Sequence, residues 1–421
     1  MSLLKMCWET IFVSRDLYEN LQAHIYQAVI EKMDFNKDLS DKEIFELIDD
    51  VIVSESKRRT IEITDRGKLK AEVYHAIRKL DVLQPFIDDP DITEIMVNGK
   101  DRIFIEKNGI LTKTESFLLT EEKLNNLILQ IVSKCNRRVN ESSPIVDARL
   151  EDGSRVNVVM SPISIDGSAI TIRKFPKNPI TMETLIRLDS ISEEAVNFLK
   201  TLIVAGYNIF ISGGTGSGKT TFLNALSAFI PREERIITIE DSAELQLLGL
   251  PNLVRLETRN QNAEGCMQIS IRDLIKTSLR MRPDRIVVGE VRGEEAVDLL
   301  QCLNTGHDGS MSTGHANSAP DMLSRLETMV LMGMDLPIGA VRRQIASGID
   351  ILVHLGRLRD KSRKVLQIVE IIDYKDGEIR LNTLFEYEEI SENEEGKVVG
   401  TLQKKAELTH KEKLVAAGFH V

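Results

Sequence analysis

The stretch Gly213-Gly214-Thr215-Gly216-Ser217-Gly218-Lys219-Thr220 decides the fold of this chain. It matches the phosphate-loop pattern G-x-x-x-x-G-K-[ST] in full. An apolar strand over 209–211 precedes it, and a helical pattern over 220–229 follows it. In such a loop the backbone N–H groups turn inward around phosphate oxygens, and the helix N-terminus favours negative charge. The sequence therefore predicts a nucleotide site made of these eight residues and Thr221.

Two acidic strand ends follow the loop along the chain. Glu240 and Asp241 come directly after an apolar strand, and Glu290 ends the strand over 285–289. Ligands in open parallel sheets bind at the carboxyl ends of the strands, so these side chains are expected beside the phosphates. We expect Lys219 to reach the β- and γ-phosphates and Glu290 or Glu240 to position the attacking water. Thr220, Glu240 and Asp241 are the predicted Mg²⁺ ligands.

Helices and strands alternate over 191–400, which is typical of an α/β domain with a mostly parallel sheet covered on both faces. Residues 351–356, 365–374 and 378–387 read as antiparallel strands added to that sheet. The stretch 386–395 holds six glutamates and is predicted to be a solvated loop. A tail over 401–421 is expected to contain a short helix.

The sequence before residue 191 lacks the regular alternation of helices and strands. Residues 1–80 read as a helical extension, in which Ser40 and Glu43 form a capping box. Short strands around a helix over 120–135 predict a small α+β domain at 85–175, followed by a linker at 176–190. Asp34, Asn36 and Asp38 resemble the start of a calcium loop. Leu39 and Phe45 stand where that loop needs Gly and Glu, so no calcium site is expected.

Composition limits the partners. The 421 residues are 42% hydrophobic and 28% charged, and the net charge is −11, which gives no general attraction to nucleic acid or to anionic lipid. The four cysteines, at positions 7, 135, 266 and 302, include no C-x-x-C pair, so reduced thiols in a cytosolic protein are expected. No apolar run approaches the roughly 18 residues of a membrane span, and no signal peptide is predicted.

Four motifs in this order resemble the secretion and pilus-assembly ATPases of type II and type IV secretion systems. They are the phosphate loop, an acidic box from Ile239 to Glu244, the strand end Gly289-Glu290, and a histidine box from Ser312 to Ser318. Within that family the chain is most similar to the Tad/Flp pilus ATPases of the CpaF type, through residues 146–149, 152–157, 172–175, 281–285 and 306–309. The resemblance covers about residues 85–385.

The resemblance implies a RecA-like domain that hydrolyses ATP with Mg²⁺ in a ring of six copies. Such a ring would work at the inner face of the cytoplasmic membrane, against integral platform proteins. Nucleic acid is not expected as a partner because the chain is acidic and has few aromatic residues. The resemblance further implies that His315 senses the γ-phosphate, although a lone histidine is more often structural. It also points to arginines of the small domain, here Arg149, Arg155 or Arg173, as γ-phosphate ligands, and Arg280 and Arg282 are candidates for contacts with a neighbouring copy. A zinc site at His315 and His307 lacks further ligands.

Two other functions remain open from the residues alone. A RecA-like core also suits a nucleic-acid translocase, which the acidic charge and the 5% aromatic content disfavour. A non-catalytic nucleotide switch is disfavoured by the intact Lys219, Thr220 and Glu290.

Overall fold

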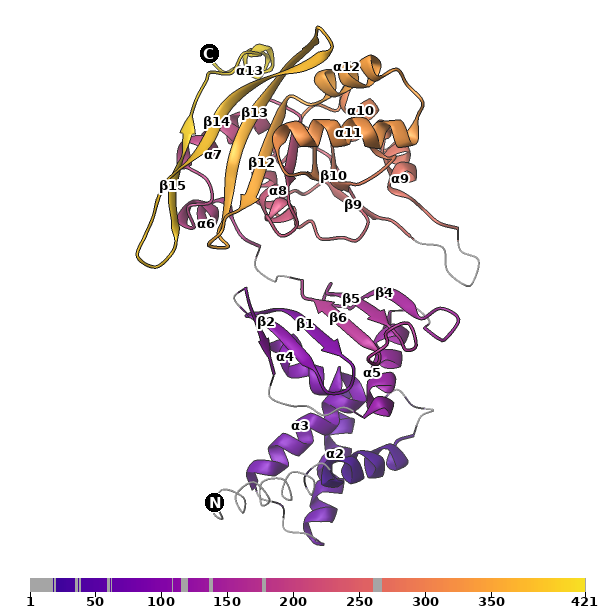
Figure 1. The fold of residues 1–421 in the computed structure, drawn as a ribbon. Helices are drawn as coiled ribbons and strands as arrows, with labels where there is room; N and C mark the ends of the chain where they lie inside the picture. Colours follow the sequence, from indigo (N-terminus) through magenta and orange to yellow (C-terminus); the bar gives the residue numbers. More distant parts are fainter. Residues whose placement is uncertain are drawn as a thin grey trace. The chain divides into compact units, whose positions relative to one another are not determined.

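The computed structural model describes residues 18, 20–34, 37, 39–58, 61, 63–107, 109–114, 120–135, 139–175, 179–259 and 267–420. The chain forms two compact units, Met1–Lys177 and Asn178–Val421. Figure 1 shows the elements of each. Asn36, Asp38, Cys7 and Cys266, and residues 176–178 at the start of the predicted linker, lie outside the described residues.

The first unit begins with a small helical group that has its own hydrophobic core. A helix over 20–32 is followed by α2 (Asp41–Ser56) and α3 (Ile63–Arg78). The predicted capping box opens α2: the N–H of Glu43 donates to the Ser40 hydroxyl, and the Glu43 carboxylate accepts from the Ser40 N–H. Ile25, Ile48 and Val73, from the three helices, are fully buried together.

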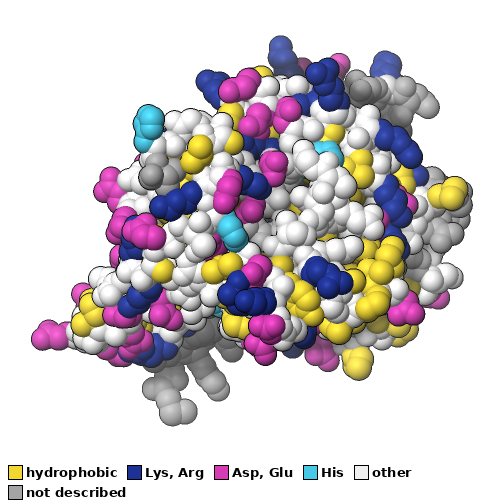
Figure 2. Space-filling model, turned by 90° about the horizontal axis from the view of Figure 1, so that it is seen from above, with side chains coloured by type: hydrophobic (Ala, Val, Ile, Leu, Met, Phe, Trp, Pro, Cys, Tyr) yellow, Lys and Arg dark blue, Asp and Glu magenta, His cyan; other side chains and the backbone are white. Residues whose placement is uncertain are grey.

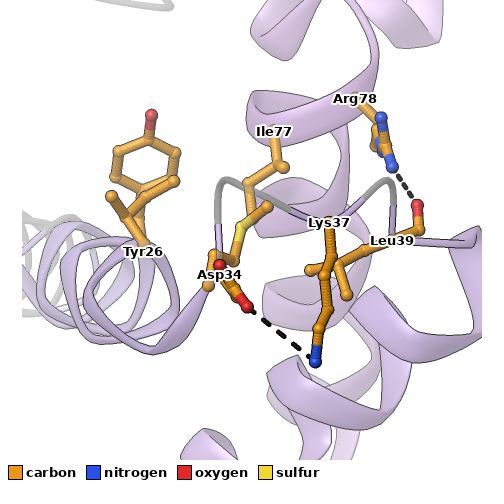
Figure 3. A pocket seen from close by; sticks show the side chains of 8 residues that line it. Tyr26, Asp34, Lys37, Leu39, Ile77 and Arg78 are labelled. Carbon is orange, nitrogen blue, oxygen red and sulfur yellow. Dashed lines mark hydrogen bonds and ion pairs between the residues drawn. The ribbon is translucent and has the colours of Figure 1, made fainter.

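Asp34, at the start of the calcium-like stretch, lies in an ion pair with Lys37 at 3.8 Å. Both residues line a cavity of about 250 Å³ in the helical group, where Arg78 donates to the carbonyl of Leu39 (Figure 3). Apolar side chains, including Ile77, form the rest of its wall.

The rest of the first unit is the predicted α+β domain. After η1 (Asp81–Leu83) and α4 (Gln84–Asp88), six antiparallel strands pair in the order β3-β2-β1-β6-β5-β4. Their bounds are β1 Ile92–Asn98, β2 Ile103–Lys107, β3 Ile110–Lys113, β4 Ile145–Arg149, β5 Arg155–Val159 and β6 Ala169–Arg173. Helix α5 (Glu121–Lys134) buries Leu124, Ile128 and Ile131 in one core with residues of the sheet.

The predicted linker is shorter than expected at its C-terminal end. Residues 182–187 form α6 (Met182–Arg187), capped by Thr181, whose hydroxyl accepts from the N–H of Thr184. Met182 and Leu185 are buried in the core of the second unit. The apolar i, i+3 spacing of these two side chains is the signal that marks this segment as a packed helix.

The second unit is built on a nine-stranded sheet in the order β15-β14-β13-β12-β7-β11-β10-β8-β9. The strands from β12 to β9 pair in parallel, as predicted for an α/β domain. Their bounds are β7 Ile209–Gly213, β8 Ile236–Glu240, β9 Leu253–Glu257, β10 Arg285–Val291, β11 Met311–His315 and β12 Ile351–Arg357. β12 was expected to be antiparallel, but it is antiparallel only to β13 and parallel to β7.

Helices cover both faces of the parallel sheet (Figure 1). Ile209 and Ile211 pack with α7 and α8 on one face, whereas Phe210 packs with α10 and α11 on the other. This alternation follows from the two-residue period of a strand. The helices are α7 Glu193–Val204, α8 Lys219–Ser227, α9 Ile271–Ser278, α10 Ala296–Leu303, α11 Ala319–Gly333 and α12 Ile338–Gly348.

The antiparallel part of the sheet is longer than the sequence suggested. β13 (Arg363–Lys375) pairs with β14 (Glu378–Glu392), and β14 pairs with β15 (Val398–Lys404). The prediction of a loop over 386–395 was therefore wrong for residues up to Glu392. Arg359 forms ion pairs with Glu389 and Glu392, which offsets the repulsion among the glutamates.

The end of the chain has the expected helix, α13 (Glu412–Ala416), but only after β15. Lys413 of α13 pairs with Asp350, just before β12, at 2.8 Å. Within the described part of the chain, no helix combines the length and the apolar character that crossing a membrane requires.

Candidate active site at the phosphate loop

The phosphate loop joins β7 to α8 as predicted. Gly218 is the N-cap of α8 and has φ of +95°, a left-handed conformation that glycine adopts without steric cost. Helix α8 therefore starts at Lys219 without a side-chain cap, and the first N–H groups of the helix stay available to an anion. Thr220 and Thr221 lie in its first turn.

The strand order brings the distant motifs to one edge of the sheet. β7, β11 and β10 are successive neighbours, and each ends in a predicted site residue or beside one. His315, the last residue of β11, pairs in register with Gly213 of the phosphate loop. Val291, which follows Glu290 on β10, pairs with Gly314. The structure thus assembles the phosphate loop, Glu290 and His315 from three separate segments, with Lys219 and His315 lying 96 positions apart in the sequence.

Lys219, His315 and Glu290 form a continuous chain of polar contacts. The ammonium of Lys219 lies 3.2 Å from Nδ1 of His315 and donates to the carbonyls of Gly213 and Gly214 at 3.1 Å. Because an ammonium can only donate, Nδ1 must be the acceptor, which places the proton of a neutral ring on Nε2. That Nε2 lies 2.8 Å from Oε1 of Glu290. His315 therefore links the cation of the phosphate loop to the carboxylate of β10.

Burial lowers the pKa values of two of these groups. It lowers the pKa of His315 below 6.5, and the nearby cations Lys219 and Arg292 lower it further, against the opposing effect of Glu290. Burial also lowers the pKa of the Lys219 ammonium, while the charge of Glu290 acts in the opposite direction. At neutral pH the ring of His315 is uncharged, and it can stand next to the Lys219 ammonium without charge repulsion.

The acidic box contributes two carboxylates in different environments. Glu240 is 4% exposed, and its Oε2 accepts from the N–H groups of Glu244 and Leu245 at 2.6 and 2.8 Å. Its Oε1 is buried and has no hydrogen-bond partner among the residues that the structure describes. Burial raises its pKa. Asp241, the next residue, is exposed at the sheet edge.

Sequence reasoning missed Arg292, two residues after Glu290. Its Nη2 donates to Oε2 of Glu290 at 2.7 Å, and its Nη1 lies 3.8 Å from Oδ2 of Asp241. Arg292 thereby connects Glu290 to the acidic box. Its position directly after the Gly-Glu strand end was the available signal.

A second residue without any motif signal is Arg363, the first residue of β13. Its Nε donates to the carbonyl of Gly216 in the phosphate loop at 2.8 Å. The contact spans 147 positions in the sequence, and no local pattern marks it.

The predicted arginines of the small domain lie in the first unit and form one row. Arg149 pairs with Arg155 across β4 and β5, and Arg155 pairs with Arg173 across β5 and β6. Directly opposed residues project from the same face of a sheet, and like charges there are destabilising. The Nε of Arg173 donates to Glu94, opposite it on β1, at 2.8 Å. An anionic ligand bound to this row would reduce the repulsion among its guanidinium groups.

Arg280 and Arg282, the candidates for contacts between copies, are both exposed. Arg282 has φ of +54°, an uncommon left-handed conformation for a side chain of this size. They stand at the start of β10, at the opposite end of that strand from Glu290.

Comparison with known proteins gives the family. Residues 77–400 match the model of the family described as "Type II/IV secretion system protein". The chain is 34% identical to the type IV secretion system protein PtlH of Bordetella pertussis, over 71% of this chain and 94% of PtlH. It is 31% identical to the conjugal transfer protein TrbB of Rhizobium radiobacter, over 75% of this chain and 96% of TrbB.

A solved structure agrees in fold. The ATPase DotB of Yersinia pseudotuberculosis superposes with a TM-score of 0.51 at 17% identity, over 73% of this chain and 80% of DotB. With the family match over most of its length and the four motifs gathered at one sheet edge, the chain belongs to the type II/IV secretion system ATPases and hydrolyses ATP.

Proposed function

We propose that this ATPase is the motor of a Tad/Flp-type pilus and works as a ring of six copies. It would act at the cytoplasmic face of the membrane, against integral platform proteins, which would hold it there. The observation that carries this proposal is the N-terminal extension. PtlH and TrbB align over nearly their whole length but leave more than a fifth of this chain unmatched, and the family match begins only at residue 77.

The extension is a folded part of the chain with a core of its own. The residues buried between its helices, including Ile44, Ile48 and Leu69, form a hydrophobic cluster separate from that of the small sheet. The runs that resemble the CpaF type lie in the small domain and the ATPase unit. The extension and these runs together favour the Tad assignment over the other branches of the family.

For hydrolysis, Lys219 would hold the β- and γ-phosphates and Glu290 would accept a proton from the attacking water. His315, in contact with both, would report the presence of the γ-phosphate to Glu290. Arg155 and Arg173 would approach the γ-phosphate when the small domain closes on ATP, and its opening after phosphate release would be the power stroke.

The residues present fit a magnesium ion. Among the described residues no three His, Cys, Asp or Glu side chains lie close enough to form a metal site. Mg²⁺ bound with ATP needs only one or two protein oxygens, because phosphates and waters supply the others. The Thr220 hydroxyl, the buried Oε1 of Glu240 and Asp241 would serve. The ion would neutralise charge on the phosphate oxygens during transfer.

A second candidate is a motor for conjugation or for type IV protein secretion, and the names of PtlH and TrbB favour it. A nucleic-acid translocase has less support. On the face that Figure 2 shows, basic and acidic side chains are interspersed, in keeping with the net charge of −11.

Deletion of the gene in its host separates these functions. We expect the deletion strain to lose surface pili, and wild-type protein but not the Lys219→Ala variant to restore them. Loss of DNA transfer or of protein secretion with pili intact would replace the Tad assignment by the second candidate. Strong stimulation of ATP hydrolysis by single-stranded DNA would support the translocase instead.

A further inference from the structure

Arg292 stands on a loop whose direction is held by Glu295. The N–H groups of Arg292 and Gly293 both donate to Oε1 of Glu295, at 2.6 and 2.9 Å. Glu295 is the N-cap residue of α10, which is packed into the core of the unit. The backbone from which the guanidinium extends is therefore anchored to the body of the unit.

The guanidinium of Arg292 has more N–H donors than its contact with Glu290 uses. Among the residues that the structure describes, Glu290 is its only side-chain hydrogen-bond partner, through Nη2. Nη1 lies 3.8 Å from Asp241, which is beyond hydrogen-bond distance. A guanidinium carries five N–H donors in one rigid plane, so Nη1 can bind a second group while the adjacent Nη2 keeps Glu290. The side chain is 63% exposed, and the second group can reach it.

Arg292 and the start of the phosphate loop line the same cavity. Its volume is about 760 Å³, and Gly214, Thr215, His315 and Asn317 also line it. The ammonium of Lys219, which is expected to reach the β- and γ-phosphates, lies 3.2 Å from Nδ1 of His315, a lining residue of this cavity. A γ-phosphate held by Lys219 would therefore lie beside the cavity that Arg292 lines.

We propose that Arg292 binds the γ-phosphate in cis through Nη1 while Nη2 holds the Glu290 carboxylate. The fork then fixes the distance between the γ-phosphorus and the group that receives the proton of the attacking water. Water oxygen bonds to the γ-phosphorus, and the bond to the β–γ bridging oxygen breaks. The electron pair leaves with ADP, and the water proton passes to Glu290 and then to the released phosphate. Arg292 also stabilises the charge on the transferred group.

This role of Arg292 rests on the ATPase activity of the chain. It does not depend on which pilus or secretion system the ATPase serves. It adds a cis arginine at the catalytic carboxylate, separate from the arginine row of the first unit. Two simpler roles make different predictions. A residue that only orients Glu290 leaves nucleotide affinity unchanged, and a residue that acts only through its charge is equivalent to any other cation in the cavity.

The test is the affinity of the full-length protein for two fluorescent nucleotides, mant-AMPPNP with the γ-phosphate and mant-ADP without it. We expect Arg292→Ala to weaken mant-AMPPNP binding about tenfold or more and to change mant-ADP binding by less than about twofold. The matched control is Arg325→Ala, which removes an exposed cation from the same cavity on α11 and should leave the ratio of the two affinities unchanged.

Arg292→Lys provides a second readout if the alanine variant is unstable. Lysine keeps the charge but cannot bridge two groups in one plane, so kcat should fall about tenfold or more while KM changes by less than about threefold. Equal loss of both nucleotides in Arg292→Ala, no loss of either, or the same selectivity change in Arg325→Ala would overturn the proposal. So would normal kcat in Arg292→Lys.

Discussion

The side chain of Glu240 occupies the space that a side chain at position 289 would need. A Cβ atom at Gly289 would lie 2.9 Å from Cγ of Glu240, closer than such atoms approach in folded proteins. The two residues stand on the neighbouring parallel strands β8 and β10. Phosphate-loop enzymes commonly carry an aspartate before or at this strand end. Here the packing of a carboxylate from the next strand explains why glycine precedes Glu290.

Gly289→Ala should therefore destabilise the second unit. We expect a loss of about 1–3 kcal/mol in the free energy of unfolding, because Glu240 is buried and cannot move aside freely. In a Glu240→Ala background the same substitution should cost less, with a coupling of at least about 0.5 kcal/mol. Urea unfolding of the four proteins measures this, and strictly additive losses would contradict it.

Lys219→Ala should abolish ATP turnover and weaken nucleotide binding, because the charge on the β- and γ-phosphates is lost. Phosphate release and mant-ATP titration measure the two effects. Lys413→Ala is a control in the same unit, since that lysine pairs with Asp350 beside α13, away from the phosphate loop. Near-normal hydrolysis by the Lys219 variant would refute the assignment of the loop.

Glu290→Gln should keep ATP binding and lose hydrolysis, because an amide cannot accept the proton from water. Glu240→Gln should be milder: its oxygen can still accept from the Glu244 and Leu245 N–H groups, and burial already disfavours its charge. Single-turnover rates for both variants decide between them. A severe loss in Glu240→Gln alone would make the acidic box the source of the base.

Acid should destabilise the protein through His315. Burial lowers its pKa in the folded state below the ordinary 6.5, so its contribution to stability is complete above 6.5 and is lost as pH falls through the folded pKa. Protonation would also place a second cation beside Lys219. The His315→Asn variant should lose less stability than wild type between about pH 7.5 and pH 5, as measured by urea unfolding. Parallel curves for the two proteins would count against this.

Arg155→Ala and Arg173→Ala should leave ATP affinity within about tenfold while turnover falls by roughly a thousandfold. The reason is that a γ-phosphate ligand delivered by domain closure acts mainly in the transition state. Arg102→Ala, on the same unit and paired with Asp166, is the control and should keep its activity. A complex with a non-hydrolysable ATP in which neither guanidinium from any copy approaches the γ-phosphate would refute the proposed closure of the small domain on ATP.

Much of the fold could be predicted because it rests on local signals. The capping box at Ser40, the glycine-rich loop and the apolar strands each carry their own pattern, and each appears where expected. The strand over 386–392 was missed because two of its glutamates, Glu389 and Glu392, form ion pairs with Arg359 that exist only in the folded sheet. Helix α6 was missed because two prolines before it, Pro176 and Pro179, restrict the backbone and suggested a linker.

By itself, the sequence determined that a phosphate loop and two acidic strand ends meet at one edge of a parallel sheet, since the carboxyl ends of parallel strands share an edge. Only the tertiary structure decided which of these groups touch. The order β7-β11-β10-β8 sets Lys219 beside His315, His315 beside Glu290, and Glu240 against Gly289. Strand order depends on how helices pack on both faces, which no local pattern records. For the same reason, no sequence pattern marked Arg292 and Arg363 as site residues. Their contacts with Glu290 and Gly216 exist only in the folded chain.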